Sequence, residues 1–280
     1  MRSTLILAVA LVGCSASAPV ELVRSRSTVL RQIELRKEQP PGVAPGLDLD
    51  GIVSDSHDGR TCFHPDFTDP SGAPGVDNQL ATLVPLIDLA GEGALQGLIQ
   101  GAINEGRLLV LFELRERTDG TAELMVRRGA DLPLLGTDGR LLAGQTLALH
   151  AEPLLGHAAS AVIEGNVVTT APFALEMPVV VFSNLYVLKL PAAKVRFELS
   201  EDGGFTNGII AGGATVDQLI SITRQAATFG GDFEGLFGDG IRDSADLARD
   251  ETGACKEVSA AMNFEAVPAF TFGDPPAVAE

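Results

Sequence analysis

The amino-acid sequence predicts a mainly β domain with two or three helices, an α+β arrangement in which an antiparallel β-sandwich or barrel carries flanking helices. Short apolar runs separated by turn residues fill most of the chain from residue 107 onward, which is typical of antiparallel sheets. Two segments instead place apolar residues at helical spacing. No period of about 20 to 50 residues repeats, which excludes a solenoid or a propeller.

The N-terminus has the pattern of an export signal. Arg2 supplies one positive charge, residues 5–12 form an apolar run, and the small residue Gly13 precedes Cys14. This is the order of parts in a secretory signal peptide. The run is much shorter than the roughly 20 apolar residues that a membrane-spanning helix needs. The sequence Leu11-Val12-Gly13-Cys14 resembles the lipobox of bacterial lipoproteins.

The resemblance to bacterial lipoproteins implies that residues 1–13 are removed as a signal peptide. It also implies that Cys14 is diacylated, becomes the new N-terminus and is usually acylated again, with palmitate-type chains. The residue after Cys14 is Ser15 and not an aspartate. In this respect the sequence resembles lipoproteins that are passed on to the outer membrane of a two-membrane cell envelope. A plain secretory signal peptide with a chance cysteine is the alternative.

Residues 14–47 are expected to form a tether, and residues 48–280 a single β-rich globular domain. The boundary rests on residues 39–46, where three prolines and two glycines interrupt any helix or central strand. Within the tether, residues 29–36 alternate in part between apolar and charged side chains. This alternation suits a strand or an amphipathic segment close to a membrane surface.

Four aspartates follow the boundary in a segment rich in glycine and small residues: Asp48, Asp50, Asp55 and Asp58. Calcium takes six to eight oxygen ligands, many from carboxylates in flexible loops, so these residues are a candidate calcium site. The EF-hand pattern is not met, because no glutamate stands at its twelfth position. Turn chemistry with solvated charges is the alternative.

Helical periodicity then predicts a helix over residues 78–105, which Pro85 and the glycines at 91 and 93 are expected to kink or divide. Turn residues, such as those at 118–120, separate the strands that follow. The predicted strands are 108–114, 122–126, 132–135, 141–149, 161–164, 167–171, 179–182, 185–190 and 195–199.

The last part of the chain begins with a second predicted helix over residues 215–228. An acidic, glycine-rich loop is expected over residues 230–253, and a final strand pair or edge over residues 258–272.

Three cysteines occur in the chain. Once Cys14 is assigned to the lipid, Cys62 and Cys255 remain, and in an oxidising compartment two cysteines are expected to pair. The sequence therefore predicts a Cys62–Cys255 disulfide, with two free thiols as the alternative. A chain-entropy estimate for so long a loop is about 5 kcal/mol of stabilisation as an upper figure.

The charge balance limits the class of partner. The chain has 20 basic and 37 acidic residues, a formal net charge of −17. Binding to nucleic acid depends on neutralising phosphates with lysine and arginine, so we expect no nucleic-acid partner. Docking of the protein surface on anionic lipid is disfavoured for the same reason, and attachment to a membrane is expected through the acyl anchor.

A second resemblance concerns the body of the protein. The residues Asp48-Leu49-Asp50-Gly51, then Cys62, and then 74–80 before a helix resemble an arrangement in uncharacterised lipoproteins of gliding soil bacteria. The resemblance implies the same anchor and a β-rich body, and it implies no activity.

These observations predict a lipid-anchored cell-envelope protein that acts as a non-enzymatic binding or structural module, with calcium as a possible stabilising ion. The sequence lacks the Gly-x-Ser-x-Gly and His-Glu-x-x-His motifs. A carrier of a lipid or other apolar ligand is the alternative, because residues 179–182 and 185–188 are apolar at successive positions, which indicates cover on both faces. An envelope hydrolase using carboxylates such as Glu113 and Asp119 is the third hypothesis. An apolar ligand or another envelope protein is the expected partner.

Overall fold

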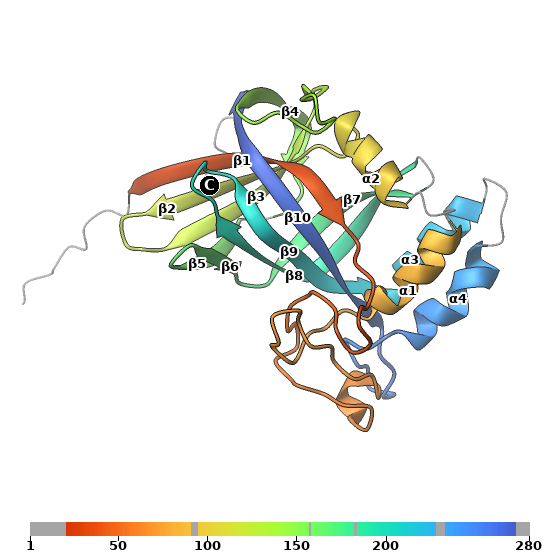
Figure 1. Ribbon diagram of the computed structural model, residues 1–280. Coiled ribbons are helices and arrows are strands. Elements are labelled where there is room, and N and C mark those ends of the chain that lie inside the picture. Colours follow the sequence, from red (N-terminus) through yellow and green to blue (C-terminus); the bar gives the residue numbers. More distant parts are fainter. Residues whose placement is uncertain (1–20, 91–94, 157, 182–183, 228–232, 273–280) are drawn as a thin grey trace, which may run out of the picture.

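The computed structural model describes residues 21–90, 95–156, 158–181, 184–227 and 233–272. The predicted signal peptide and Cys14 lie outside these residues. The fold is mainly β, as the sequence predicts, and its sheet closes into a barrel (Figure 1).

Eight antiparallel strands form the barrel, and each pairs with the next of the eight along the chain. The circuit closes where β10 returns to β1, with Val29 opposite Val267. This is the up-and-down order of closed antiparallel barrels, which leaves no free sheet edge. The strands are β1 (Leu22–Glu34), β2 (Val110–Arg117), β3 (Ala122–Gly129), β5 (Ala159–Glu164), β6 (Val167–Thr170), β8 (Asn184–Leu199), β9 (Phe205–Thr215) and β10 (Glu257–Phe272).

Two further strands extend the barrel. Strand β4 (Gln145–Leu154) runs antiparallel to β3 and parallel to the last residues of β10. Strand β7 (Phe173–Val181) forms a hairpin with β8. The expected strands at 132–135 and 141–149 correspond to an isolated bridge between Leu135 and Leu141, followed by β4.

Four α-helices and one 3-10 helix, η1 (Gly59–Thr61), accompany the strands in the described chain. The α-helices are α1 (Leu80–Ala90), α2 (Leu95–Asn104), α3 (Val216–Ala227) and α4 (Phe233–Asp243). We call α1, α3 and α4 the helical cap, since they gather at one end of the barrel, while α2 lies between the cap and β4 (Figure 1). None of the described helices is long and apolar enough to cross a membrane.

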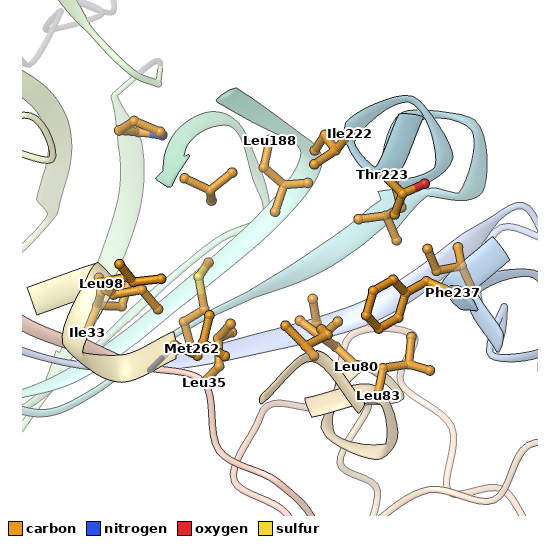
Figure 2. Close-up of a pocket in the computed structure, with 18 of the residues that line it drawn as sticks. Ile33, Leu35, Leu80, Leu83, Leu98, Leu188, Ile222, Thr223, Phe237 and Met262 are labelled. Carbon is orange, nitrogen blue, oxygen red and sulfur yellow. The ribbon is translucent and has the colours of Figure 1, made fainter. Parts of the chain in front are cut away.

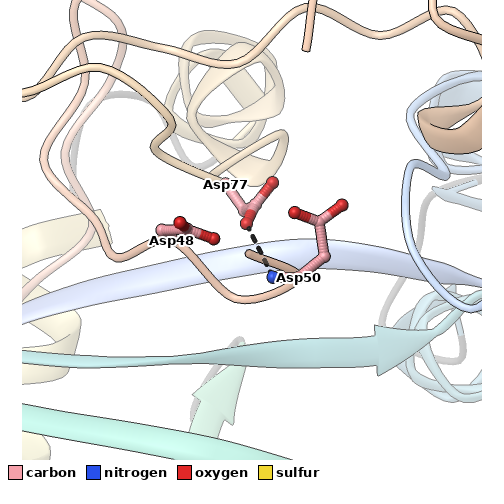
Figure 3. Close-up of side chains that lie close together, drawn as sticks. All are labelled: Asp48, Asp50 and Asp77. Carbon is pink, nitrogen blue, oxygen red and sulfur yellow. Dashed lines mark hydrogen bonds between the residues drawn. The ribbon is translucent and has the colours of Figure 1, made fainter. Parts of the chain in front are cut away.

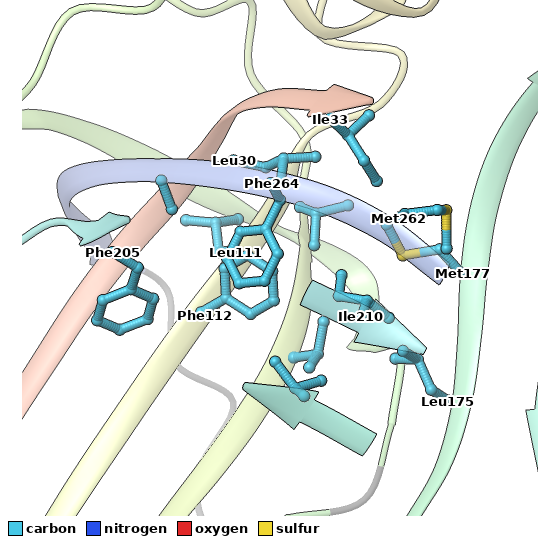
Figure 4. Packing of buried hydrophobic residues seen from close by; sticks show 14 of the residues in the cluster. Leu30, Ile33, Leu111, Phe112, Leu175, Met177, Phe205, Ile210, Met262 and Phe264 are labelled. Atoms are coloured by element: carbon cyan, nitrogen blue, oxygen red, sulfur yellow. The ribbon is translucent and has the colours of Figure 1, made fainter. Parts of the chain in front are cut away.

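Aromatic rings fill the middle of the barrel (Figure 4). The centroids of Phe112 and Phe264 lie 4.9 Å apart, and those of Phe197 and Phe205 lie 4.0 Å apart, both pairs stacked. All four side chains are buried. An eight-stranded barrel has an interior just wide enough to be filled by side chains or to hold one small ligand. In this barrel, these four phenylalanine side chains, which we call the aromatic group, fill the middle of the interior.

Strand β1 changes the expected domain boundary. It occupies residues 22–34, which the sequence assigned to a tether over 14–47. Val29, Leu30 and Ile33 are buried, and the strand pairs with both β2 and β10. The partial alternation of apolar residues in this segment is therefore that of a barrel strand with one face inward, and β1 belongs to the folded body.

Strand β9 lies where the sequence predicted no element. Its glycines lower its strand propensity. Glycine is nevertheless required at 208, because a Cβ atom there would lie 2.5 Å from the ring of Phe264. The missing side chain makes room for the aromatic core, so the residue that weakens the local strand signal is the residue that the barrel needs.

Helix α4 lies within the segment predicted as an acidic loop over residues 230–253. Its glycines lower its helix propensity, since glycine is a poor helix former, and the sequence therefore did not indicate a helix here. Phe237 and Ile241 are buried in one hydrophobic cluster with Leu83 of α1 and Ile220 of α3. Packing against the other cap helices therefore stabilises α4 where its local propensity does not.

The remaining elements differ from the prediction mainly in their ends. The expected helix over 78–105 is divided into α1 and α2, with Pro85 inside α1 and residues 91–94 outside the described chain. The expected strands 185–190 and 195–199 are one continuous strand, β8. The segment over 258–272, predicted as a final strand pair or an edge, is the single strand β10, which pairs with β1 and β9.

Candidate functional site

A pocket of about 210 Å³ lies between the capped end of the barrel and the helices (Figure 2). The strands supply one side of its wall, and the helices, including α2, supply the other. Each element places one or more apolar side chains on the pocket, for example Ile33 on β1, Leu188 on β8, Met262 on β10, Leu83 on α1, Ile222 on α3 and Phe237 on α4.

The pocket follows a boundary between two hydrophobic clusters. Ile33 and Met262 belong to the barrel core. Leu83, Phe237 and Ile241 belong to a separate cluster within the cap. The cap helices cover the end of the barrel, but the two clusters do not fill the space between them, and this space is the pocket.

The wall of the pocket is almost purely hydrocarbon. Thr223 is the one described lining residue with a polar side chain, and its Oγ1 donates a hydrogen bond to the carbonyl of Ile220 at 2.8 Å. None of the described lining residues is charged. A wall of this kind offers burial of apolar surface to a ligand, and it penalises any polar group that enters without a partner.

The hairpin of β7 and β8 contributes three residues to the pocket lining, Pro178, Val179 and Leu188. Leu185 and Val187, on the other face of β8, are 38% and 47% exposed. The expected cover on both faces is therefore wrong at Leu185 and Val187, whereas Leu188 is covered; residue 182 lies outside the described residues.

The predicted disulfide is present and joins Cys62 to Cys255, with a Cα–Cα distance of 6.1 Å. Cys62 follows η1, and Cys255 precedes β10 and packs against the cap cluster. The bond therefore fastens the aspartate-rich segment to the end of the barrel that carries the pocket.

Three carboxylates come together beside β9 and β10, those of Asp48, Asp50 and Asp77 (Figure 3). One oxygen of each lies within 4.8 Å of the others. Asp77 is buried, and its Oδ2 accepts hydrogen bonds from the backbone N–H groups of Leu49 at 2.6 Å and Asp50 at 3.4 Å. Burial, reinforced by the neighbouring carboxylate of Asp50, raises the pKa of Asp77 to about 7. Burial also raises the pKa of Asp50.

The structure thus gathers two of the four aspartates of the calcium hypothesis and adds Asp77. Asp58 instead receives hydrogen bonds from the side chain and backbone of Arg60, which lower its pKa to about 2. Asp55 accepts a hydrogen bond from the backbone N–H of His57 at 2.8 Å. Asp77 is distant in sequence from the other two and joins them because its backbone pairs with Leu47, which no local motif indicates.

A second buried carboxylate lies close to the cap. The carboxylate of Asp246, which follows α4, accepts hydrogen bonds from the backbone and hydroxyl groups of Ser259 on β10. The hydroxyl of Ser259 in turn accepts a hydrogen bond from the backbone N–H of Gln79, just before α1, at 2.8 Å. Burial raises the pKa of Asp246 to about 7.

The two carboxylates of the hydrolase hypothesis lie outside the pocket lining. Glu113 forms an ion pair with Arg127 at 2.9 Å. Asp119 accepts hydrogen bonds from the backbone and hydroxyl of Thr121 within the turn between β2 and β3. Both carboxylates therefore already have structural partners.

Comparison with protein-family models, curated proteins and solved structures finds no match for this chain. Function is therefore inferred from the residues of the chain itself.

Proposed function

We propose that this protein is a non-enzymatic binding protein that holds an apolar small molecule in the pocket between the barrel and the helical cap. The hydrocarbon wall of the pocket carries the proposal. Thr223, its polar lining residue, satisfies its hydroxyl with the carbonyl of Ile220. Burial stabilises a bound ligand by roughly 25 cal/mol per Å² of apolar surface. The wall therefore favours hydrocarbon over any polar metabolite.

The barrel supports this proposal through its size and filling. Eight-stranded barrels either fill their interior with side chains or hold one small ligand. Here the aromatic group around Phe112 and Phe264 occupies the middle, and space remains at the capped end. Ligands of many proteins bind in such barrel mouths, where a rigid wall is already formed.

We also propose that the protein is exported and lipid-anchored through Cys14, with the outer membrane as its expected site. The lipobox-like residues before Cys14 support this assignment. The Cys62–Cys255 disulfide also supports it, because such bonds are typical of oxidising compartments.

The position of β1 indicates which end of the barrel would lie nearer to the lipid anchor. This strand begins at Leu22, at the end of the barrel far from the cap (Figure 1). An extended chain spans at most about 3.6 Å per residue, so the stretch from Cys14 to Leu22 reaches roughly 29 Å. In the anchored protein, the pocket would therefore lie at the end of the molecule farther from the point of attachment.

Binding of N-phenyl-1-naphthylamine to the mature chain tests the proposal. The fluorescence of this probe rises in an apolar site, and we expect saturable binding to a single site. The substitution Leu188→Asn places an amide in the wall and should weaken binding by about tenfold or more, because the amide has no partner there.

Val187→Asn is the matched control. Val187 is the neighbouring residue on β8 and lies on the exposed face, so its substitution should leave the affinity unchanged. Thermal melting of both variants checks that they fold. Absence of saturable binding to the wild-type chain, or equal loss in both folded variants, would contradict the proposal.

A further inference from the structure

In the view of Figure 2, labelled side chains face one another across the pocket in two rows. Leu188 of β8 and Ile222 and Thr223 of α3 lie on one side, and the other side carries residues of β1, β10, α1 and α2. Ile33 and Leu98 lie at one end of the space, and Phe237 lies at the other. An elongated space between two rows matches an extended chain better than a wide ring system.

The size of the pocket limits the number of chains. Its volume is about 210 Å³. An apolar cavity of about 150 Å³ holds one benzene molecule, and pockets for drug-sized ligands measure roughly 300–1,000 Å³. The pocket therefore has room for one slender hydrocarbon segment and not for two chains side by side.

The barrel side of the pocket is closed. Met262 lines the pocket, and Phe264, two residues further along β10 and on the same face of the strand, stacks on Phe112. Figure 4 shows Met262 beside Met177 at the edge of the packed core. A chain that enters the pocket must therefore end there and cannot pass through the barrel.

Two basic residues next to the lining, Lys189 and Arg224, are each paired with a carboxylate. Lys189 follows Leu188 and pairs with Glu176 at 3.3 Å. Arg224 follows Thr223 and donates two hydrogen bonds to Glu234, at 2.7 and 2.6 Å. The described lining itself contains no charge. A charged or strongly polar head inside the pocket would be buried without a partner, which is costly.

From these features we infer that the ligand is a single-chain amphiphile, which inserts one unbranched acyl or alkyl chain into the pocket and leaves its polar head in solvent. This inference rests on the proposed binding function and names the class of ligand. It holds equally for a free fatty acid, a long-chain alcohol and a lysolipid, because these share the inserted part.

Displacement of N-phenyl-1-naphthylamine by straight-chain alcohols and carboxylic acids, from octanol and octanoate to hexadecanol and hexadecanoate, tests the inference. Each added methylene should tighten binding by about fourfold while the chain still enters the pocket, and the affinity should then level off. The alcohol and the acid of equal length should bind alike, since their heads stay outside. A lysophospholipid should displace the probe, and the matching two-chain phospholipid should not.

A variant with a shorter pocket gives an independent test. Ala260 lies in the pocket wall on β10, so Ala260→Leu should move the plateau to shorter chains without changing the increment per methylene. Leu219→Phe enlarges a side chain of α3 in the pocket wall and should also move the plateau to shorter chains. This variant replaces Ala260→Leu if the latter fails to fold.

The possible failures are distinguishable. Displacement by sterols but not by straight chains would overturn the inference and leave the proposed binding function standing. Equal displacement by one-chain and two-chain phospholipids would also overturn the inference and leave the binding function standing. An affinity that is independent of chain length would have the same consequence. If the probe does not bind to the folded wild-type protein, the binding function and the inference both fail.

Discussion

Asp246 accepts two hydrogen bonds from Ser259, one from its backbone N–H at 2.7 Å and one from its hydroxyl at 2.6 Å. Because the same hydroxyl accepts a hydrogen bond from the N–H of Gln79, this pair connects the end of α4, strand β10 and the start of α1. The buried carboxylate therefore lies at the base of the helical cap, and its protonation affects the stability of the region around the pocket.

Stability should increase as the pH falls from 8 to 5. The pKa of Asp246 and that of Asp77 are raised by burial from 3.8 to about 7 in the folded state. A raised pKa contributes stability that is fully present below the unfolded pKa and is lost as the pH rises through the folded pKa. A tenfold difference in proton affinity between the folded and unfolded states corresponds to about 1.4 kcal/mol. We therefore expect the melting temperature, measured in the presence of chelator, to be higher at pH 5 than at pH 8 by at least ~3 °C.

The substitution Asp246→Asn is the control for this pH dependence. The amide cannot ionise, so the melting temperature of the variant should vary less with pH between 5 and 8 than that of the wild type. Asp58, whose pKa is lowered to about 2, loses its contribution only as the pH falls below its ordinary value and does not affect this range. A wild-type melting temperature that rises with pH in this range would contradict the prediction.

Loss of the disulfide should destabilise the fold strongly. The variant Cys62→Ser/Cys255→Ser opens a loop of 193 residues and should lose about 2–5 kcal/mol of unfolding free energy, measured by denaturant titration. Reducing agent should lower the stability of the wild type to the same level and leave the variant unchanged. If reductant affects both proteins equally, its effect does not come from this bond.

The calcium hypothesis predicts that added calcium raises the melting temperature at pH 8 more than at pH 6. Protons compete with the ion because the pKa of Asp77 is about 7. Asp77→Asn should remove the response, which calorimetric titration with calcium chloride measures directly. Asp55→Asn is the control, because Asp55 lies outside the group of three. A calcium response that survives Asp77→Asn would assign the ion to another place.

Two glycine substitutions should have opposite effects on stability. Gly208→Ala places a Cβ 2.5 Å from the ring of Phe264 and should destabilise the fold by roughly 1–3 kcal/mol, because the core must shift. Gly101→Ala lies in helix α2, where a Cβ meets nothing within 4 Å. It should stabilise by up to about 1 kcal/mol through helix propensity. Denaturant titration of both variants compares the two values, and equal effects would contradict the assigned role of Gly208.

The anchor hypothesis predicts the mass and the location of the mature protein. Extracted from membranes, the chain should begin at Cys14 and carry diacylglycerol with an additional acyl group. The variant Cys14→Ser should lack this mass and appear in the soluble fraction after export. An unmodified wild-type chain that retains Met1 would contradict the assignment to the envelope.

The sequence was most informative where structure depends on local pattern. The turn at 118–120 separates two apolar runs, and these became the hairpin of β2 and β3. Helical periodicity located the segments of α1, α2 and α3. The cysteine pair followed from counting, because only two candidates remained. In the first two cases the signal lies within a few residues, and in the third only one pairing was available if a disulfide formed.

The sequence by itself determined the mainly β class, the helices with clear periodicity and the disulfide. Tertiary structure alone decided the rest: that β1 belongs to the barrel, that glycine-rich β9 is a strand, and that Asp77 joins Asp48 and Asp50. The pocket also belongs to this second group, because its wall combines residues from β1, from the cap and from β10. Contacts between residues far apart in the chain override local propensity when burial stabilises them, and such contacts leave no pattern in neighbouring residues.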